Sequence, residues 1–347
     1  MEWKFSNWKL GAEYFWNEFT LNYLMATYSK TQVSILNGIV MGGGAGASIH
    51  GRFRVATENS VWLFYLHNVI VVCRLLLAPY VFIRDIFFKV FAMPETALGL
   101  FPDVGASYYL SRLPGFFGEY VGLTGARLDG AEMVACGLAT HFMPSERLTS
   151  LEEALHKVDS GDSMVVSAII EEFSLLPTLK EKSAYHRVRN LMDFDGLRLL
   201  FTAEFLFFKS LLLCRLDIID RCFSSRTIEE ILSALESEAD KSKDDWLSLT
   251  IQALKKASPT SLKISLRSIR EGRLQGVGQC LVRDYRMVCS VMRGKVSKDF
   301  FEWEPSRLDL ITDSMADSYF SKLDDDNWRD LKLPARSNLP VHAIAKL

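Results

Sequence analysis

Residues 93–105 constrain this chain more than any other segment, because they place two acids in an apolar stretch interrupted by Gly and Pro. Glu95 and Asp103 are those acids, and a glycine-rich run at residues 42–46 precedes them. Burying an ionised carboxylate without a partner is costly, so acids in such surroundings are usually paired or used. Taken alone, the two acids are more often capping or turn residues. Together with the glycine run, they suggest acyl-group chemistry.

The composition excludes several classes of function. At 347 residues the chain can bury a large core in one or two domains. Its net charge is −2, so nothing favours binding to nucleic acid or to an anionic membrane. The six cysteines are scattered without a Cys-x-x-Cys pair, and the six histidines are equally dispersed. We therefore expect no metal site and no disulfide framework, and a reducing compartment.

The first half of the chain predicts strands around the glycine run. Residues 33–40 are typical of a buried strand, residues 42–46 of a tight turn, and residues 53–56 of the next strand, with a helix or short turn from Ala47. The glycines also fit a weak dinucleotide-binding pattern. However, the next strand begins too soon for a crossover helix, and Glu58 lies closer than the usual ~20-residue spacing. Dinucleotide binding is therefore rejected.

The second half predicts helices. Thr227 and Glu230 fit a capping box, which predicts a helix start at this position. Ser258 and Pro259 are typical of an N-cap and a first helical residue. The acidic run at residues 324–326 is interpreted as a solvated group of charges.

Further motifs occur along most of the chain. They are residues 37–41, 51–57, 91–95, 105–110, 123–128, 136–141, 258–263 and 267–273. In this order they resemble the crotonase (enoyl-CoA hydratase/isomerase) superfamily, and within it the 3-hydroxyisobutyryl-CoA hydrolase branch. Motifs in a fixed order are much more specific than any single glycine pattern.

The resemblance implies an α/β fold with a crotonase-like ββα spiral core, followed by a mainly helical C-terminal region. We expect a partial acyl-CoA-binding core at residues 12–150, the helical region at residues 151–335 and a tail at residues 336–347. In the family, strand units that carry a second N–H donor precede the matched segment. No strand unit with such a donor precedes Glu18 in this sequence. The core is therefore expected to be incomplete at the N-terminus.

Two apolar segments, residues 62–90 and 188–215, interrupt the resemblance. Arg74 and Arg84 break the first, and several charged residues break the second, so neither predicts a membrane span. We interpret both as translated introns, because residues 188–189 and 214–215 can be encoded by donor-like and acceptor-like splice sequences. Ordinary long insertions are the alternative, although structureless loops of this length are uncommon. Sequencing the mature transcript decides between them, because an abundant message that retains both segments contradicts the intron hypothesis.

The resemblance also assigns roles to individual residues. It implies that Glu95 is the main base or nucleophile, and that Asp103 orients a substrate hydroxyl and assists proton transfer. It further implies that Gly43 donates an N–H to the reacting carbonyl oxygen and that Glu18 contacts the substrate. Each has a plainer alternative: Gly43 as a turn residue and Glu18 as a helix-surface carboxylate.

The implied activity is hydrolysis of 3-hydroxyisobutyryl-CoA, or a close short-chain 3-hydroxyacyl-CoA, to the free acid and CoA in valine catabolism. No metal or redox cofactor is expected, because CoA is part of the substrate. The acyl-CoA substrate is the expected partner, without nucleic acid or membrane, and a homo-oligomer stays open. The alternatives are a truncated, non-catalytic homologue, a hydratase or isomerase of the same superfamily, and a membrane-associated interaction protein.

The C-terminal tripeptide, Ala345-Lys346-Leu347, differs by one small residue from the Ser-Lys-Leu peroxisomal signal. In an acyl-CoA enzyme this favours a peroxisomal location. The first residues match neither a signal peptide nor a transit peptide. A mitochondrial location is the alternative if a transit peptide is missing from this sequence.

Overall fold

The structure is a computed structural model, and it describes most of the chain. The described residues are 8–38, 40–59, 81–84, 91–158, 160–180, 183, 215–242, 244–293, 305–326 and 328–336. Most of the two interrupting segments and the C-terminal tripeptide lie outside these ranges. The translated-intron hypothesis and the peroxisomal signal therefore stay predictions.

Two parallel sheets form the core. The larger has the strand order β4-β1-β3-β6, with β1 (Gln32–Leu36) paired to both β3 (Phe53–Ala56) and β4 (Val81–Arg84), and β6 (His141–Phe142) at one edge. The smaller pairs β2 (Val40–Met41) with β5 (Phe91–Ala92). The expectation of one strand over residues 33–40 was wrong, because the chain leaves the first sheet after Leu36. There the Asn37 side chain accepts a hydrogen bond of 2.8 Å from the Thr57 hydroxyl.

The pairing follows a repeat of two strands and a helix. β1 and β2 lead into α3 (Gly43–Ser48), and β3 and β5 lead into the short helix η1 (Pro94–Leu98). Because β1 pairs with β3 and β2 with β5, successive units stack in parallel, as a ββα spiral requires. The α/β prediction is thus confirmed for the described part of the core.

The glycine run differs from its prediction. Gly42 alone makes the turn, with a φ of 46°, and the helix begins at Gly43 instead of Ala47. A positive φ is cheap only for glycine, so one residue reverses the chain and the remaining small residues become helical. Ala45 and Ala47 are buried by this packing.

Part of the first interrupting segment belongs to the larger sheet. β4 lies within residues 62–90 and pairs in parallel with β1, with Gln32 opposite Val81. The remainder of that segment lies outside the described residues, as does almost all of residues 188–215. The chain is described again from Arg215, where α10 begins.

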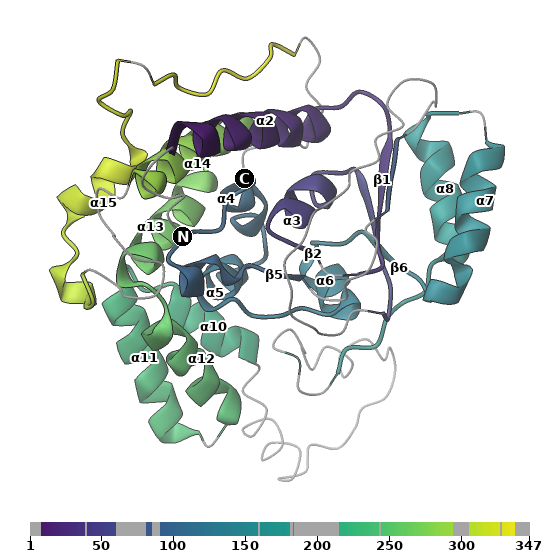
Figure 1. Cartoon of the computed structure of the whole chain (residues 1–347). Coiled ribbons are helices and arrows are strands. Elements are labelled where there is room, and N and C mark those ends of the chain that lie inside the picture. Colours follow the sequence, from purple (N-terminus) through teal and green to yellow (C-terminus); the bar gives the residue numbers. More distant parts are fainter. Residues whose placement is uncertain are drawn as a thin grey trace, which may run out of the picture.

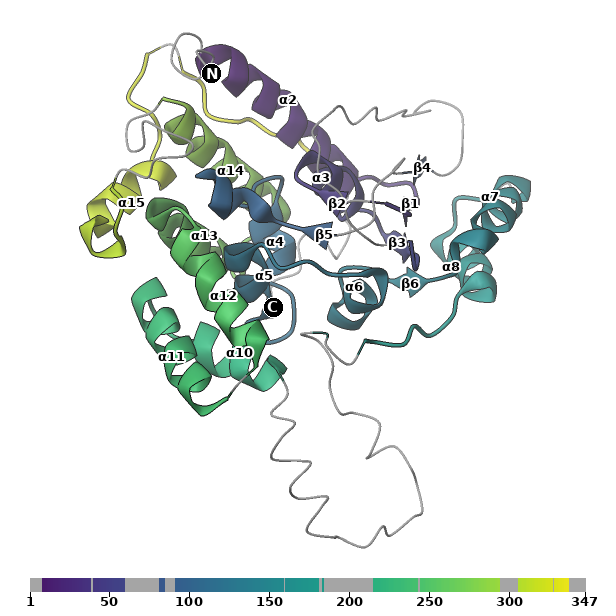
Figure 2. The same cartoon turned by 60° about the horizontal axis from the view of Figure 1, so that its bottom comes forward.

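Helices surround the core (Figures 1 and 2). They are α2 (Trp8–Ala26), α4 (Ala106–Leu110), α5 (Phe117–Thr124), α6 (Gly130–Cys136), η2 (Ser145–Arg147), α7 (Leu148–Lys157), α8 (Ser163–Phe173), α10 (Arg215–Phe223), α11 (Ile228–Lys241), α12 (Asp245–Lys256), α13 (Pro259–Gly272), α14 (Val277–Met292), η3 (Leu308–Leu310) and α15 (Asp313–Phe320). Thr227 and Glu230 form the expected capping box of α11, and Ser258 caps α13 with Pro259 in its first turn. The mainly helical C-terminal region is confirmed in the described residues.

The helices cover the two faces of the larger sheet differently. Figure 1 shows α7 and α8 on one side of β1, and α2, α13 and α14 on the other. Val33 and Ile35 of β1 pack with Leu151 of α7 and Ile170 of α8 in one apolar cluster. A larger cluster joins α2, α4, α5, α13 and α14. Within the described ranges, no helix combines the length and apolar character needed to cross a membrane.

Candidate functional site

The structure brings together the four site residues that the sequence predicts. α2 supplies Glu18, the start of α3 supplies Gly43, η1 supplies Glu95, and the segment after η1 supplies Asp103. Glu18 Oε1 lies 2.7 Å from the position that a Cβ on Gly43 would occupy, and Glu95 Oε1 lies 3.9 Å from the same position on Gly42. The charges of Glu95 and Glu18 both act on Asp103.

Glu95 is held on a short, tightly bounded helix. Pro94 starts η1, and Gly99 ends it in a left-handed conformation with a φ of 73°. Glu95 is 8% exposed, and its Oε2 has no hydrogen-bond partner among the described residues. Burial raises the pKa of Glu95 to about 8. This carboxyl can therefore gain or lose a proton near neutral pH, as a general acid or base must.

Asp103 occupies a strained turn. Val104, which follows it, has a φ of 52°, and Gly105 has a φ of 80°. The Val104 carbonyl lies 2.8 Å from Nε2 of His50. The pKa of Asp103 is raised well above its usual range, first by burial and then by the charges of Glu95, Glu18 and Asp284.

Glu18 points from α2 toward the glycine run. Burial raises the pKa of Glu18 to about 7. Tyr14 lies one turn earlier on α2 and is 62% exposed. Its pKa is raised by partial burial and by the charges of Glu18 and Asp103, so it lies beside these acids.

Sequence reasoning missed Asp284 and Tyr109. Asp284 of α14 is fully buried, and its Oδ2 accepts a hydrogen bond of 2.9 Å from the Gly105 N–H. The Tyr109 hydroxyl donates to Met93 Sδ at 3.6 Å, and its pKa is raised by burial and by the nearby acids. A signal for Asp284 was present, because Leu281 and Val288 share its apolar helix face at a spacing of three to four residues.

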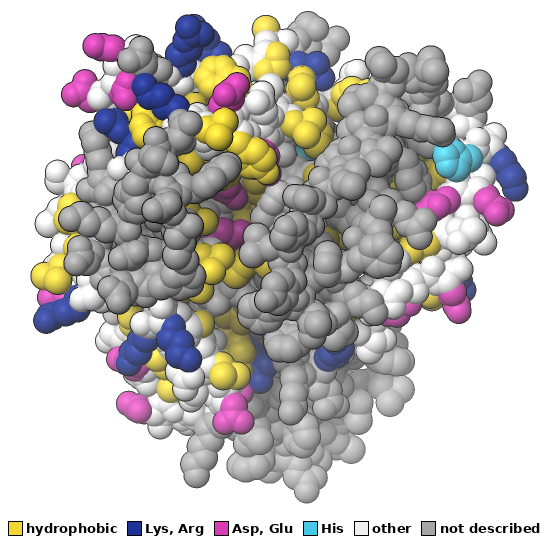
Figure 3. Space-filling model, viewed as in Figure 1, with side chains coloured by type: hydrophobic (Ala, Val, Ile, Leu, Met, Phe, Trp, Pro, Cys, Tyr) yellow, Lys and Arg dark blue, Asp and Glu magenta, His cyan; other side chains and the backbone are white. Residues whose placement is uncertain are grey.

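Several acids thus share one region, in which Glu95 and Asp284 are buried and Glu18 and Asp103 are partly buried. Neighbouring carboxylates cannot all ionise cheaply, so their protonation states depend on one another. In the space-filling view, acidic side chains lie among hydrophobic ones in a hollow near the middle of this face (Figure 3). Carboxyl groups with raised pKa values lie around the start of α3, at Gly43. Such groups can transfer protons to and from a bound carbonyl compound.

Comparison with known proteins gives one consistent family. A family model described as enoyl-CoA hydratase/isomerase matches residues 3–64, 88–196 and 207–320. The Arabidopsis thaliana protein named 3-hydroxyisobutyryl-CoA hydrolase 1 is 57% identical over 355 residues, covering 98% of this chain and 78% of that protein. Another from Arabidopsis thaliana, Probable 3-hydroxyisobutyryl-CoA hydrolase 3, is 55% identical over 97% of this chain and 78% of its own length.

Solved structures share the fold. The crystal structure of a carnitinyl-CoA dehydratase from Mycobacterium thermoresistibile superposes with a TM-score of 0.67 at 24% identity. The match covers 94% of this chain and 77% of that one. This likeness concerns the architecture and not the reaction.

Proposed function

The chain belongs to the enoyl-CoA hydratase/isomerase family, and from that premise we propose that it hydrolyses 3-hydroxyisobutyryl-CoA to the free acid and CoA. The names of its most similar relatives support this substrate. The observation that carries the proposal is the convergence of Glu95, Asp103 and Glu18 beside Gly43. Proton-transfer groups near a backbone N–H donor are what hydrolysis of a thioester requires, and this supports the proposal.

Each residue has a role in the proposed hydrolysis. Ionised Glu95 takes a proton from water, and the resulting hydroxide adds to the thioester carbonyl. The Gly43 N–H donates to the oxyanion that develops, since the first N–H groups of a helix lack acceptors within it. One such donor contributes ~3 kcal/mol to transition-state stabilisation. The C–S bond then breaks, and the CoA thiolate is protonated from Glu95 or Asp103, while Asp103 also orients the 3-hydroxyl group.

The proposal extends to setting and location. Hydrolysis of this thioester is a step of valine catabolism, and it needs no metal or redox cofactor. Ala345-Lys346-Leu347 supports import into peroxisomes by a receptor that reads C-terminal residues. Imaging of an N-terminally tagged fluorescent fusion tests the location, and a diffuse signal unaffected by deleting the tripeptide contradicts it.

A thiol-release assay on the purified chain tests the activity. We expect 3-hydroxyisobutyryl-CoA to yield free CoA well above the uncatalysed rate. Loss of the enoyl absorbance of crotonyl-CoA, measured in parallel, reports hydration. Absence of thiol release from a folded chain identifies a non-catalytic homologue, and hydration without release identifies a hydratase.

The rate of hydrolysis is expected to rise with pH up to about 8, the raised pKa of Glu95. The base is the ionised form, so its fraction falls about tenfold for each pH unit below that pKa. We therefore expect log kcat to climb with a slope near one and then level off. Initial rates at saturating substrate, corrected for uncatalysed hydrolysis, check this. A flat profile from pH 6 to pH 8 contradicts the role of Glu95 as the base.

Gly43→Ala is expected to lower kcat/KM by about tenfold, because the new Cβ would lie 2.7 Å from Glu18 Oε1. The Glu18 carboxyl must then leave its place beside Gly43. In a Glu18→Ala background that collision disappears, so the same substitution should have little further effect. Steady-state rates of the two single variants and the double variant measure the coupling. Equal effects in both backgrounds contradict the placement of Glu18.

A further inference from the structure

We infer that Asp284 of α14 is a positioning residue for Asp103: it holds the backbone turn that carries this acid and sets a second carboxylate beside it. The inference rests on the proposed hydrolase function, in which Asp103 faces the substrate. It assigns to the helical region a direct part in building the site. Asp284 lies 179 residues from Gly105, the residue it binds, and no local motif joins the two.

The turn after Asp103 needs external support. Val104 is β-branched and has a φ of 52°, a conformation that is strained for a non-glycine residue. Such a conformation persists only when its surroundings fix it. Two side chains from distant elements do so here. Asp284 Oδ2 accepts the Gly105 N–H at 2.9 Å, and His50 Nε2 lies 2.8 Å from the Val104 carbonyl.

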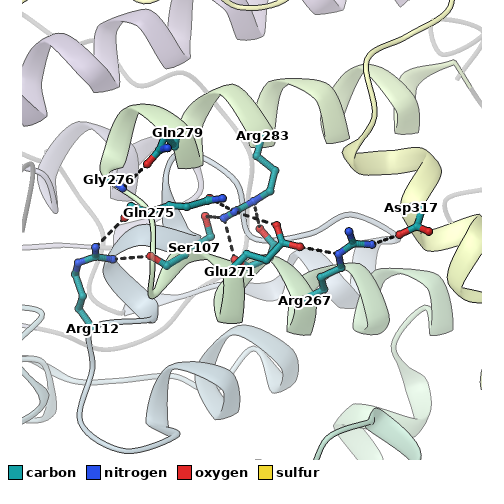
Figure 4. Close-up of polar contacts among 11 residues, drawn as sticks. Ser107, Arg112, Arg267, Glu271, Gln275, Gly276, Gln279, Arg283 and Asp317 are labelled. Carbon is teal, nitrogen blue, oxygen red and sulfur yellow. Dashed lines mark hydrogen bonds and ion pairs between the residues drawn. The ribbon is translucent and has the colours of Figure 1, made fainter. Parts of the chain in front are cut away.

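The neighbouring residue on α14 strengthens this attachment. Arg283 donates to the Ser107 hydroxyl of α4 at 2.8 Å (Figure 4). It also donates to the Ser268 carbonyl of α13 at 2.9 Å. α14 therefore contacts α4 at two points: Asp284 binds Gly105, the N-cap of α4, and Arg283 binds Ser107 in the first turn of α4. Because α14 also packs on α2, one helix contacts both the Asp103 segment and the helix that carries Glu18.

Asp284 contributes charge as well as geometry. It is fully buried, and its Oδ1 has no hydrogen-bond partner among the described residues. A purely structural acceptor for one N–H does not require a carboxylate, since an amide oxygen would serve. Burial raises the pKa of Asp284 to about 7, although Arg283 lowers it, and the ionised form raises the pKa of Asp103. The other titratable or charged groups that bear on Asp103, Asp284 or their turn are Tyr14, Glu18, His50, Glu95, Tyr109, Cys280 and Arg283.

Asp284→Asn separates charge from geometry, because asparagine keeps an acceptor for the Gly105 N–H. We expect it to lower the pKa of Asp103, since a like charge has been removed. Carboxyl ¹³C titration of the full chain with labelled aspartate measures this, with the Asp103 signal assigned by its loss in Asp103→Asn. Ser107→Ala is the matched control, because it loosens α14 from α4 without changing charge. If the pKa of Asp103 is unchanged in Asp284→Asn, or shifts equally in Ser107→Ala, the proposed effect of the Asp284 charge on Asp103 is overturned.

Asp284→Ala removes the acceptor itself. We expect kcat for CoA release to fall about tenfold below that of Asp284→Asn at the same pH, with KM nearly unchanged, because Asp103 is misplaced. Equal kcat values in the two variants overturn the positioning part. If Asp284→Ala does not fold, exchange of the Gly105 amide in the wild-type chain replaces it, and absence of protection there overturns the proposed acceptor role. The titration does not depend on turnover, so a wild-type chain without CoA release refutes the function and leaves the titration informative.

Discussion

Glu95→Gln is expected to lower kcat for CoA release from 3-hydroxyisobutyryl-CoA by roughly 10²–10⁴-fold, the usual contribution of a general base. Glutamine keeps the size of the side chain and cannot accept the proton of the attacking water. Glu95 is buried, and the neighbouring Asp103 is assigned a different role, so we expect it to replace the base only poorly. Single-turnover measurements of thiol release on the purified variant test this.

Stability separates a chemical defect from unfolding. The pKa of Glu95 is raised from 4.5 to about 8 in the folded chain, so the unfolded chain ionises first as pH rises. Stability is therefore lost progressively between these two values, and Gln removes that loss. We expect Glu95→Gln to raise the Tm, more at pH 8 than at pH 5. A lowered Tm with unchanged CoA release would refute both the burial and the catalytic role.

Glu132→Gln is a matched control for Glu95→Gln. Glu132 is also a buried glutamate, but it belongs to the capping box of α6, where it accepts the Asp129 N–H at 2.9 Å. Glutamine can keep that bond. We expect turnover to change little, so a comparable loss in both variants would indicate a general effect on the fold.

Asp103→Asn is expected to lower kcat for 3-hydroxyisobutyryl-CoA by about 10²-fold, since asparagine cannot transfer the proton. The loss should be smaller with isobutyryl-CoA, which lacks only the hydroxyl group that Asp103 is proposed to orient. Parallel thiol-release assays with the two substrates measure the difference. Equal losses would show that Asp103 does not recognise the hydroxyl.

The control for this variant is Asp162→Asn, the same chemical change at an acid that caps α8 through the Met164 N–H. Asparagine caps helices as well as aspartate does, so neither stability nor turnover should change appreciably. Removing Asp103 should also stabilise the chain at neutral pH, since its carboxyl is crowded by other acids. A strong loss of stability would indicate a structural role instead.

Local signals predicted much of this molecule. Thr227 and Ser258 begin helices where capping chemistry places them, because a cap is decided by neighbouring residues. The roles of Glu95 and Asp103 came from the family resemblance, since taken alone the two acids are more often capping or turn residues. These predictions did not require knowledge of the tertiary structure.

Features decided by distant contacts were not predicted. The strand at residues 33–40 is divided between two sheets, and the packing of two successive units decides where it breaks. The helix begins at Gly43 because Gly42 makes the turn, and β2 just before this turn pairs with the distant β5. Asp284 entered the site from α14, and only the folded chain shows which turn it meets.

The hydrogen bond between Asp284 and Gly105 joins the two sides of the expected domain boundary near residue 150. A fragment ending there would contain Glu95, Asp103 and the start of α3 at Gly43. It would lack the carboxylate that fixes the turn after Asp103. The C-terminal helical region therefore supplies part of the proposed site. We expect the two halves to have changed together whenever this reaction was altered in evolution.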